Sequence, residues 1–143
     1  MSKNETPMTR WYWRQVGGTL IEEFPVVERG PDCERRAVDA IIIVGGVNRI
    51  AHWREPHQLE GKDIIVVQTK AERLGMYLMG QVFFSARLVE RFKPRSVLSV
   101  ALVNQNDSVL GPLLEAHPGM KVVICPADIG TERAEPEQES CAL

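Results

Sequence analysis

Runs of hydrophobic residues, separated by turns rich in glycine and proline, divide this chain into alternating strands and helices. Runs rich in Val and Ile predict five strands, at residues 19–27, 36–44, 62–70, 96–103 and 120–125. Apolar residues at helical spacing predict three helices, at residues 8–17, 74–92 and 108–117. The third strand contains an unbroken run of Ile and Val at 64–67, which is typical of a strand covered on both faces.

The order of these elements predicts how the strands pair. The connections between the first three strands are compatible with an antiparallel meander, whereas the long helix between the third and fourth strands suits a parallel crossover. The polar connection at 47–61 is too long for a hairpin turn. We therefore expect an α/β fold: a single-domain sandwich with a central mixed β-sheet flanked by helices.

Length and composition set the limits of this domain. The chain has 143 residues, of which 44% are hydrophobic and 25% charged, as in ordinary globular proteins. We expect a polar, disordered N-terminus at 1–7, one domain at 8–126 and an acidic, disordered tail at 127–143. No apolar run approaches the roughly 20 residues that cross a bilayer, and the first ten residues lack the core of a secretory signal. We expect a cytoplasmic protein without a membrane partner.

Charge is unevenly distributed along the chain. The formal net charge is −2, but five of the 19 acidic residues and one of the 17 basic residues lie from Asp128 onward. Residues 1–127 therefore carry a net charge of +2, which permits a phosphate-bearing partner. Cys33, Cys125 and Cys141 are widely spaced and odd in number, a pattern that fits reduced thiols better than disulfides or a zinc site.

Two polar residues at the end of the third predicted strand are the first candidates for chemistry. Gln68 and Lys70 share one face by strand alternation, and Thr69 lies on the other. Asp39 interrupts the apolar run at 37–43, where an ionised carboxylate is costly to bury. If these two strands pair antiparallel in suitable register, Asp39 meets Gln68. The alternatives are that Lys70 simply reaches solvent and that Asp39 pairs with a neighbouring arginine at a strand end.

A third oxygen ligand comes from Glu22 or Glu23 on the first strand. Alternation lets one of them face the site, and we expect Glu23, although a solvated pair of acids on an edge strand is an open alternative. Two carboxylates, an amide and an ammonium together describe a site for Mg²⁺ or Mn²⁺ that acts on a phosphate-like substrate. Arginines flank this centre and could grip phosphates: Arg35, Arg36 and Arg73.

These motifs make the chain resemble the PD-(D/E)XK nuclease superfamily. The resemblance rests on Asp39 followed by a strand that ends in Gln68-Thr69-Lys70, the Gln-x-Lys variant found in relatives of the Mrr kind. It covers residues 8–126 and implies a restriction-endonuclease-like core of αβββαβ order. It also implies magnesium-dependent hydrolysis of DNA, with RNA as an open alternative. Gln68 departs from the family's usual acid, because a neutral oxygen binds a cation more weakly.

The resemblance also implies roles for individual residues. Asp39 would be the central metal ligand, with Gln68 at the second acid position and the backbone carbonyl of Thr69 as a further ligand. Lys70 would be the motif's lysine and Glu23 the acid that some members supply from the start of the core. Gln81, on the long helix, would assist in substrate binding as the glutamine of exonuclease-like branches does; its alternative is an ordinary helix-surface amide.

Three functions are consistent with these observations. The first is a metal-dependent nuclease that acts on DNA with catalytic residues Asp39, Gln68, Lys70 and Glu23. The second is a catalytically inactive member of the same fold, which serves as a nucleic-acid-binding or assembly subunit. The third is an unrelated α/β domain that binds a small molecule. A chain of this size without a separate recognition domain would act as a homodimer or within a larger complex.

Overall fold

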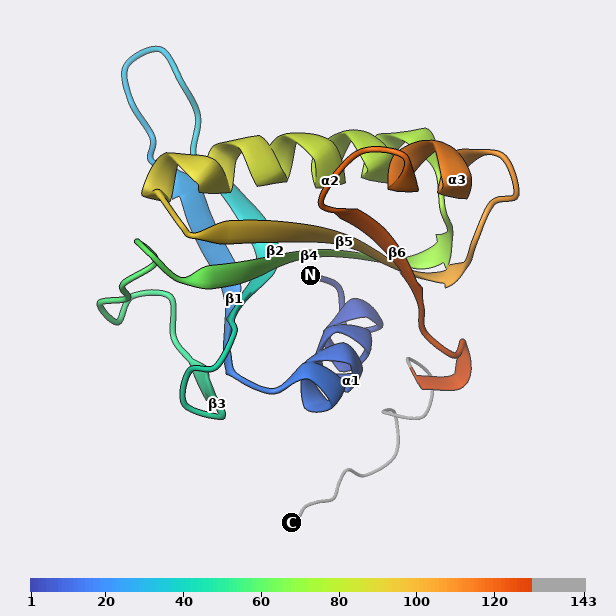
Figure 1. Ribbon diagram of the computed structural model, residues 1–143, viewed down its shortest axis with the longest axis horizontal. Coiled ribbons are helices and arrows are strands. Elements are labelled where there is room, and N and C mark those ends of the chain that lie inside the picture. The colour runs from blue at the N-terminus through green and yellow to red at the C-terminus, as the bar shows by residue number, and fades with distance from the viewer. Residues whose placement is uncertain (130–143) are drawn as a thin grey trace.

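Six strands form one mixed sheet that lies between two helical layers (Figure 1). The computed structural model describes residues 1–129, so the predicted tail lies outside the described residues from 130 onward. The elements in chain order are α1 (Glu5–Val16), β1 (Thr19–Val27), β2 (Arg36–Ile43), β3 (Arg49–Ala51), β4 (Asp63–Arg73), α2 (Met76–Val89), the 3-10 helix η1 (Glu90–Phe92), β5 (Ser96–Gln105), α3 (Leu110–Glu115) and β6 (Met120–Ile124).

The strand order across the sheet is β3-β1-β2-β4-β5-β6. β2 pairs antiparallel with both β1 and β4, while β5 pairs parallel with β4 and with β6. This arrangement confirms the predicted α/β sandwich with a mixed sheet. β3, which pairs parallel with β1, was not predicted from the sequence. α1 covers one face of the sheet, and α2 and α3 cover the other (Figure 1).

The first helix begins within the segment 1–7, which composition predicted to be disordered. Its start is stabilised by reciprocal bonds between Ser2 and Glu5: the Glu5 N–H donates to Ser2 Oγ over 3.2 Å, and the Ser2 N–H donates to Glu5 Oε1 over 3.1 Å. This is a capping box, which pairs two backbone N–H groups that a helix start otherwise leaves without partners. None of the helices in residues 1–129 is long and apolar enough to span a membrane.

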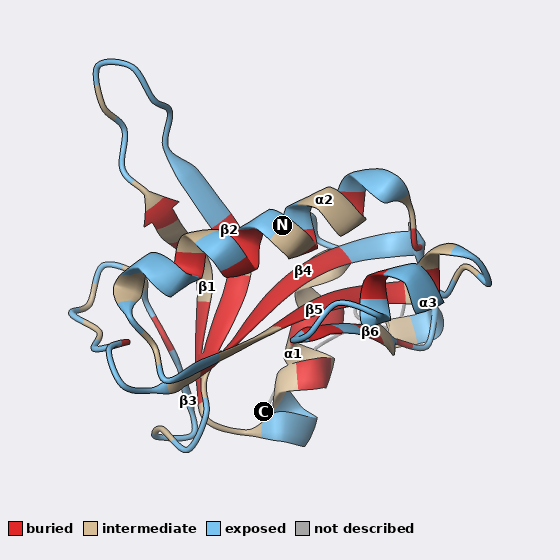
Figure 2. Cartoon of the chain, turned by 45° about the horizontal axis from the view of Figure 1, so that its top comes forward, coloured by how far each residue is buried: buried red, intermediate tan, exposed pale blue. Residues whose placement is uncertain are grey.

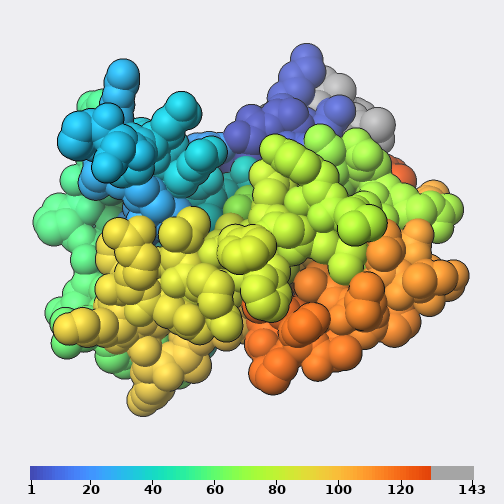
Figure 3. Space-filling model, turned by 90° about the horizontal axis from the view of Figure 1, so that it is seen from above, coloured from blue at the N-terminus to red at the C-terminus, as the bar shows by residue number. Residues whose placement is uncertain are grey.

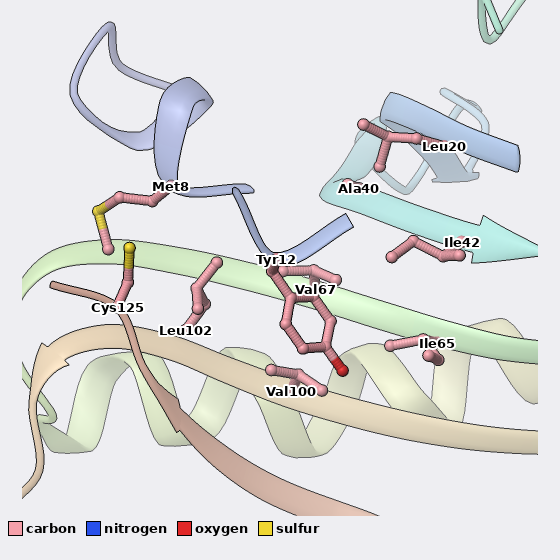
Figure 4. Close-up of a cluster of buried hydrophobic side chains, with 10 residues drawn as sticks. All are labelled: Met8, Tyr12, Leu20, Ala40, Ile42, Ile65, Val67, Val100, Leu102 and Cys125. Carbon is pink, nitrogen blue, oxygen red and sulfur yellow. The ribbon is translucent and has the colours of Figure 1, made fainter. Parts of the chain in front are cut away.

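Hydrophobic side chains fill both sides of the sheet, whose central strands are buried (Figure 2). On the α1 side, Met8 and Tyr12 pack over Ala40, Val67 and Leu102 in one cluster (Figure 4). On the opposite side, α2 contributes its own buried residues: Leu78, Val82, Ala86 and Val89. Burying one large apolar side chain stabilises the fold by about 1.5–3 kcal/mol, so these clusters hold both helical layers against the sheet.

The strict alternation of side chains between the two faces of the sheet breaks down near the middle of the paired part of β1 and β2. Ile21 and Phe24 lie three residues apart yet pack in the same cluster, and so do Val38 and Ile41 on β2. Between the first pair, Glu23 has a φ of 55°, in the left-handed region that non-glycine residues rarely adopt. Simple alternation, which would put Asp39 on the same face as Ile41, therefore does not describe this part of β2.

Candidate functional site

The candidate site lies where β2 and β4 part. The two strands pair regularly from Ile43 opposite Ile64 to Ala40 opposite Val67. One residue further, side-chain oxygens replace the backbone carbonyls as hydrogen-bond acceptors. The Thr69 N–H donates to Asp39 Oδ2 over 2.8 Å, and the Asp39 N–H donates to Gln68 Oε1 over 3.2 Å. The structure thus places Asp39 beside Gln68, but the contact runs through the Asp39 backbone N–H, and the two side chains have their partners on opposite sides of the sheet.

Consecutive residues of β4 connect this junction to the two helical layers. Gln68 Nε2 donates to Ser85 Oγ on α2 over 2.7 Å, and Gln68 is 5% exposed. The Thr69 hydroxyl lies 2.7 Å from the Thr9 hydroxyl on α1. Gln68 and Thr69 therefore point to opposite faces, as strand alternation requires. The sequence analysis did not single out Ser85 and Thr9, although each is a hydroxyl on the buried side of a helix.

Asp39 carries the most perturbed carboxyl group of this junction. Burial raises its pKa from 3.8 to about 6, and the hydrogen bond from Thr69 and the charge of the Met1 ammonium oppose that shift. The nearby carboxylates Glu23 and Glu5 raise the pKa further. A buried carboxyl with a shifted pKa is a common feature of functional sites. Burial is the main cause here, and only the two neighbouring carboxylates, which raise the pKa further, would favour a cation beside it.

The structure also distinguishes the two glutamates of β1. Glu22 accepts two hydrogen bonds from Arg10 of α1, both of 2.9 Å, and is committed to that ion pair. Glu22 lies opposite Ala40 on β2, and Glu23 is the next residue. Glu23 forms an ion pair with the Met1 ammonium, and this contact raises the pKa of the ammonium. Glu23, as expected from the sequence, is therefore the glutamate beside Asp39.

Lys70 lies apart from the junction. Its strand partner Val103 and the partner of Gln68, Ala101, belong to the same cluster under α2 and α3, so Lys70 and Gln68 share a face as predicted. The Lys70 side chain is 49% exposed, however, and its Nζ lies 3.9 Å from Glu72. The structure shows no contact between Lys70 and Asp39 within the described residues.

The predicted phosphate-gripping residues separate into two groups. Arg36 and Gln81 line a groove of about 500 Å³ between β2 and α2, together with the buried Gln68 and Ser85 and the exposed Tyr77. The other two arginines have different contacts: Arg35 stacks on Trp53, with its guanidinium 5.2 Å from the ring centroid, and Arg73 donates to the backbone oxygen of Asn106 over 3.0 Å.

The predicted metal ligands fit a divalent cation only in part. Asp39 and Glu23 supply two carboxylates, and Mg²⁺ needs few protein ligands because it keeps several waters. Gln68 does not complete the set, because its oxygen accepts the Asp39 N–H and its nitrogen is tied to Ser85 on the α2 side. Among residues 1–129, no group of three or more His, Cys, Asp or Glu side chains could hold a metal ion.

Comparisons with known proteins add no relative to this picture. A scan against protein-family models, a search of curated proteins and a search of solved structures each found no match. The function must therefore be argued from the junction of β2 and β4 and from the groove beside it.

Proposed function

We propose that this chain is a nucleic-acid-binding domain that holds a strand of DNA in the groove between β2 and α2 without cutting it. One observation carries the proposal: Arg36, Gln81 and Gln68, from three different elements, line the same groove as the exposed ring of Tyr77. Tyr77 is 82% exposed, so its ring is open to a ligand. Arg36 and Gln68 are predicted site residues on their chemistry, and Gln81 is one that the resemblance implies.

Each of these groups suits a different part of a nucleotide. The Arg36 guanidinium is planar and can donate two parallel hydrogen bonds to a phosphate. Within the part of the chain that the structure describes, Arg36 forms no ion pair, so its charge is available to a ligand. The Tyr77 ring offers a surface on which a base can stack, and the Gln81 amide can donate to and accept from polar edges.

The junction of β2 and β4 acts on the groove through Gln68. The backbone N–H of Asp39 donates to the amide oxygen of Gln68, and the amide nitrogen of Gln68 donates to Ser85 Oγ, which fixes the orientation of the Gln68 side chain. An amide nitrogen carries two N–H groups, so Gln68 can donate its second one to a ligand in the groove. In this proposal the backbone of Asp39 is the positioning group, and the amide of Gln68, at the motif's acid position, serves binding.

Cleavage is the second candidate function, and the environment of Asp39 favours it. Its raised pKa and the adjacent Glu23 describe a place where a divalent cation would lower the cost of two close carboxylates. Mg²⁺ or Mn²⁺ held there would neutralise charge on a phosphodiester. Lys70 would have to leave Glu72 and reach round from the α2 face of the sheet, because the charged groups beside Asp39 lie on the α1 side.

Binding is tested with labelled single-stranded DNA, duplex DNA and RNA, followed by fluorescence anisotropy at low and high salt. Arg36→Ala and Gln81→Ala are compared with matched controls on the opposite helix, Arg14→Ala and Gln15→Ala, where both residues are exposed. We expect Arg36→Ala to weaken binding roughly 5- to 10-fold, about 1–1.4 kcal/mol, and to flatten the salt dependence. Equal affinities for Arg36→Ala and Arg14→Ala would overturn the assignment of the groove.

Cleavage is tested in the same samples with added Mg²⁺ or Mn²⁺ and gel analysis of the labelled strand. The proposal expects the wild-type protein to leave the strand intact. If the wild-type protein cuts DNA and both Asp39→Asn and Lys70→Ala abolish cutting, the nuclease function replaces binding alone. Cutting that survives both substitutions is to be assigned to a contaminating enzyme, and the binding proposal then stands on the anisotropy.

A further inference from the structure

A second hollow adjoins the groove on the α2 side of the sheet, beyond the end of α2. Its volume is about 600 Å³, and it lies between the end of β1, the connection at 53–57 and η1. We call it the η1 hollow, and its aromatic and basic lining residues are Phe24, Trp53, Arg54, His57, Arg91 and Phe92. Figure 3 looks onto α2, with the hairpin between β1 and β2 along the flank of its last turns and the 52–60 connection at the border beyond.

The basic side chains of the η1 hollow are available to a ligand. The Arg54 guanidinium lies 4.9 Å from the centroid of the Trp53 ring, and the Arg35 guanidinium lies 5.2 Å from it. A guanidinium stacked on a ring keeps its in-plane N–H groups, which can donate to a phosphate. Within residues 1–129, neither of these arginines nor Arg91 forms an ion pair.

Two acids also line the hollow, and one of them is already paired. Glu55 accepts a hydrogen bond of 2.6 Å from Arg49 and one of 3.0 Å from the His52 N–H. These contacts lower the pKa of Glu55 to about 2, so its carboxylate is ionised and held by Arg49. Glu28 is then the remaining acid against three arginines, so the η1 hollow favours an anionic ligand.

We infer that a single strand of nucleic acid held in the groove between β2 and α2 continues into the η1 hollow. There its phosphates would meet Arg54 and Arg91, and a base would contact the aromatic side chains. This inference rests on the proposed function and deepens it. It makes the ligand single-stranded, and it makes the affinity depend on whether the strand is long enough to reach the second space.

Two features make the path between the two spaces continuous. Val26 lines both of them, and Arg91 donates to the Val26 oxygen over 3.4 Å. Arg35 and Arg36 are consecutive residues, yet Arg36 lines the groove and Arg35 lies on the Trp53 ring. A polyanion that leaves the groove beside Arg36 therefore meets further guanidinium groups in the η1 hollow.

An extended single strand suits this arrangement better than a small anion or a duplex. Aromatic rings lie beside the arginines in both spaces, namely Tyr77 in the groove and Trp53 and Phe92 in the hollow. A basic track with aromatic side chains along it holds single-stranded nucleic acids without reading their sequence. A mononucleotide would occupy one space, and the bases of a duplex are already stacked on one another.

The test measures how affinity depends on strand length, by fluorescence anisotropy with labelled oligothymidylates of about 4 to about 16 nucleotides. Arg54→Ala and Arg91→Ala should each weaken the binding of the longest strands roughly 5- to 10-fold and lower the salt slope by about 0.7 for one lost phosphate contact. The shortest strands, which the groove alone holds, should bind as to the wild type. Arg14→Ala, at an exposed arginine of α1, is the control and should change neither.

Tryptophan fluorescence provides a second readout, because a base in contact with Trp53 quenches its emission. The other two tryptophans, Trp11 and Trp13, belong to α1 on the opposite face of the sheet. Long strands should therefore quench the wild-type protein and leave Trp53→Phe, which keeps an aromatic ring, nearly unquenched. Circular dichroism confirms that each variant is folded.

The outcomes separate this inference from the proposed function. If Arg36→Ala weakens strands of every length while Arg54→Ala and Arg91→Ala match Arg14→Ala, the groove stands and its continuation is wrong. If the two hollow variants weaken binding and Arg36→Ala does not, the strand bypasses the groove, and both proposals are wrong. A long strand that binds without quenching Trp53, and that inorganic polyphosphate displaces equally well, would overturn the base contact.

Discussion

The two principal helices that cover the sheet differ in how they use their outer sides. α1 buries Met8 and Tyr12 against the sheet and closes its borders with polar contacts: Arg10 binds Glu22, and Trp13 Nε1 donates to the Gly18 oxygen over 2.8 Å. α2 also buries one side, but Tyr77 and Phe84 project from its other side. Exposed apolar rings beside the polar Gln81 and Arg87 give the outer side of α2 the mixed composition of a contact surface.

The same contrast holds for polar residues. The α1 side gathers charges, namely Met1, Glu5 and Glu23, around Asp39. On the α2 side the buried polar tie to β4 is neutral, from Gln68 to Ser85. A ligand that enters from the α2 side therefore meets the Gln68 amide and exposed side chains, whereas the charged groups around Asp39 lie on the opposite, α1 side of the sheet. Four measurements test this division, from the largest expected effect to the smallest.

Substituting a methionine on each helix tests most directly whether α1 is buried and the outer side of α2 is exposed. Met8 is fully buried, so Met8→Ala should lower the free energy of unfolding by about 2–5 kcal/mol through lost packing and the cavity it leaves. Met76→Ala, at a residue 74% exposed, should change it by less than about 0.5 kcal/mol. Urea unfolding measures both. Equal losses would mean that Met76 is covered in solution.

The charged surroundings of Asp39 predict an unusual dependence on pH. The folded protein raises the pKa of this carboxyl from 3.8 to about 6, so folding favours the protonated form. The stability contributed by this group therefore falls as pH rises between these values, by at most about 3 kcal/mol, and stays low above them. Asp39→Asn removes the charge and keeps an oxygen that can accept the Thr69 N–H.

We expect Asp39→Asn to equal the wild type near pH 4 and to exceed it by about 1–3 kcal/mol at pH 8. Urea unfolding of both proteins at a series of pH values gives the difference in their free energies of unfolding. The contributions of the other titrating groups cancel in this difference. A variant less stable than the wild type at pH 8 would show that the carboxylate is well compensated, and the case for a cation at this position would then be lost.

On the α2 side, the buried hydrogen bond between Gln68 and Ser85 should have a measurable effect. Ser85→Ala leaves the Gln68 nitrogen without this partner and should cost about 1–3 kcal/mol. Ser108→Ala, at an exposed serine, is the matched control and should cost less than about 0.5 kcal/mol. If Ser85→Ala loses no more free energy of unfolding than its control, the Gln68 amide forms a different hydrogen bond in the variant. The groove would then not hold the Gln68 amide in a fixed position.

The smallest effect is expected at Lys70. Its ion pair with Glu72 is long and exposed to solvent, so Lys70→Ala should change the free energy of unfolding by less than about 0.5 kcal/mol. Urea unfolding at low and high salt checks this. A loss above about 1 kcal/mol would place the ammonium in a buried contact, and would bring Lys70 back toward the junction of β2 and β4.

Hydrophobic pattern predicted most of the fold. The five predicted strands and three predicted helices are present, because each carries enough buried apolar residues to establish its period. β3 escaped prediction because three residues carry no period. The early start of α1 did have a signal, the Ser2 and Glu5 spacing of a capping box, which composition obscured.

The parts of the candidate site that depend on strand pairing could be predicted from the sequence. The parts that depend on local backbone conformation were harder to predict. Antiparallel register places Asp39 beside Gln68, although it is the Asp39 backbone N–H and not its carboxylate that contacts the amide. The left-handed conformation of Glu23 shifts the alternation beside it, and side-chain periodicity contains no sign of that shift. Lys70 faces solvent at a point where β4 continues to Arg73, three residues beyond its predicted end, with exposed residues from Lys70 onward.

The short β3 strand determines how neighbouring molecules can meet. A long strand at the border of a sheet presents unpaired backbone groups, and foreign chains can extend the sheet by adding to them. Here that border is a strand of three residues, Arg49–Ala51, whose first residue carries a positive charge. β3 offers too few donors and acceptors to template another strand. Beyond it the border continues along β1, where the left-handed Glu23 and the missing N–H of Pro25 also disfavour sheet extension.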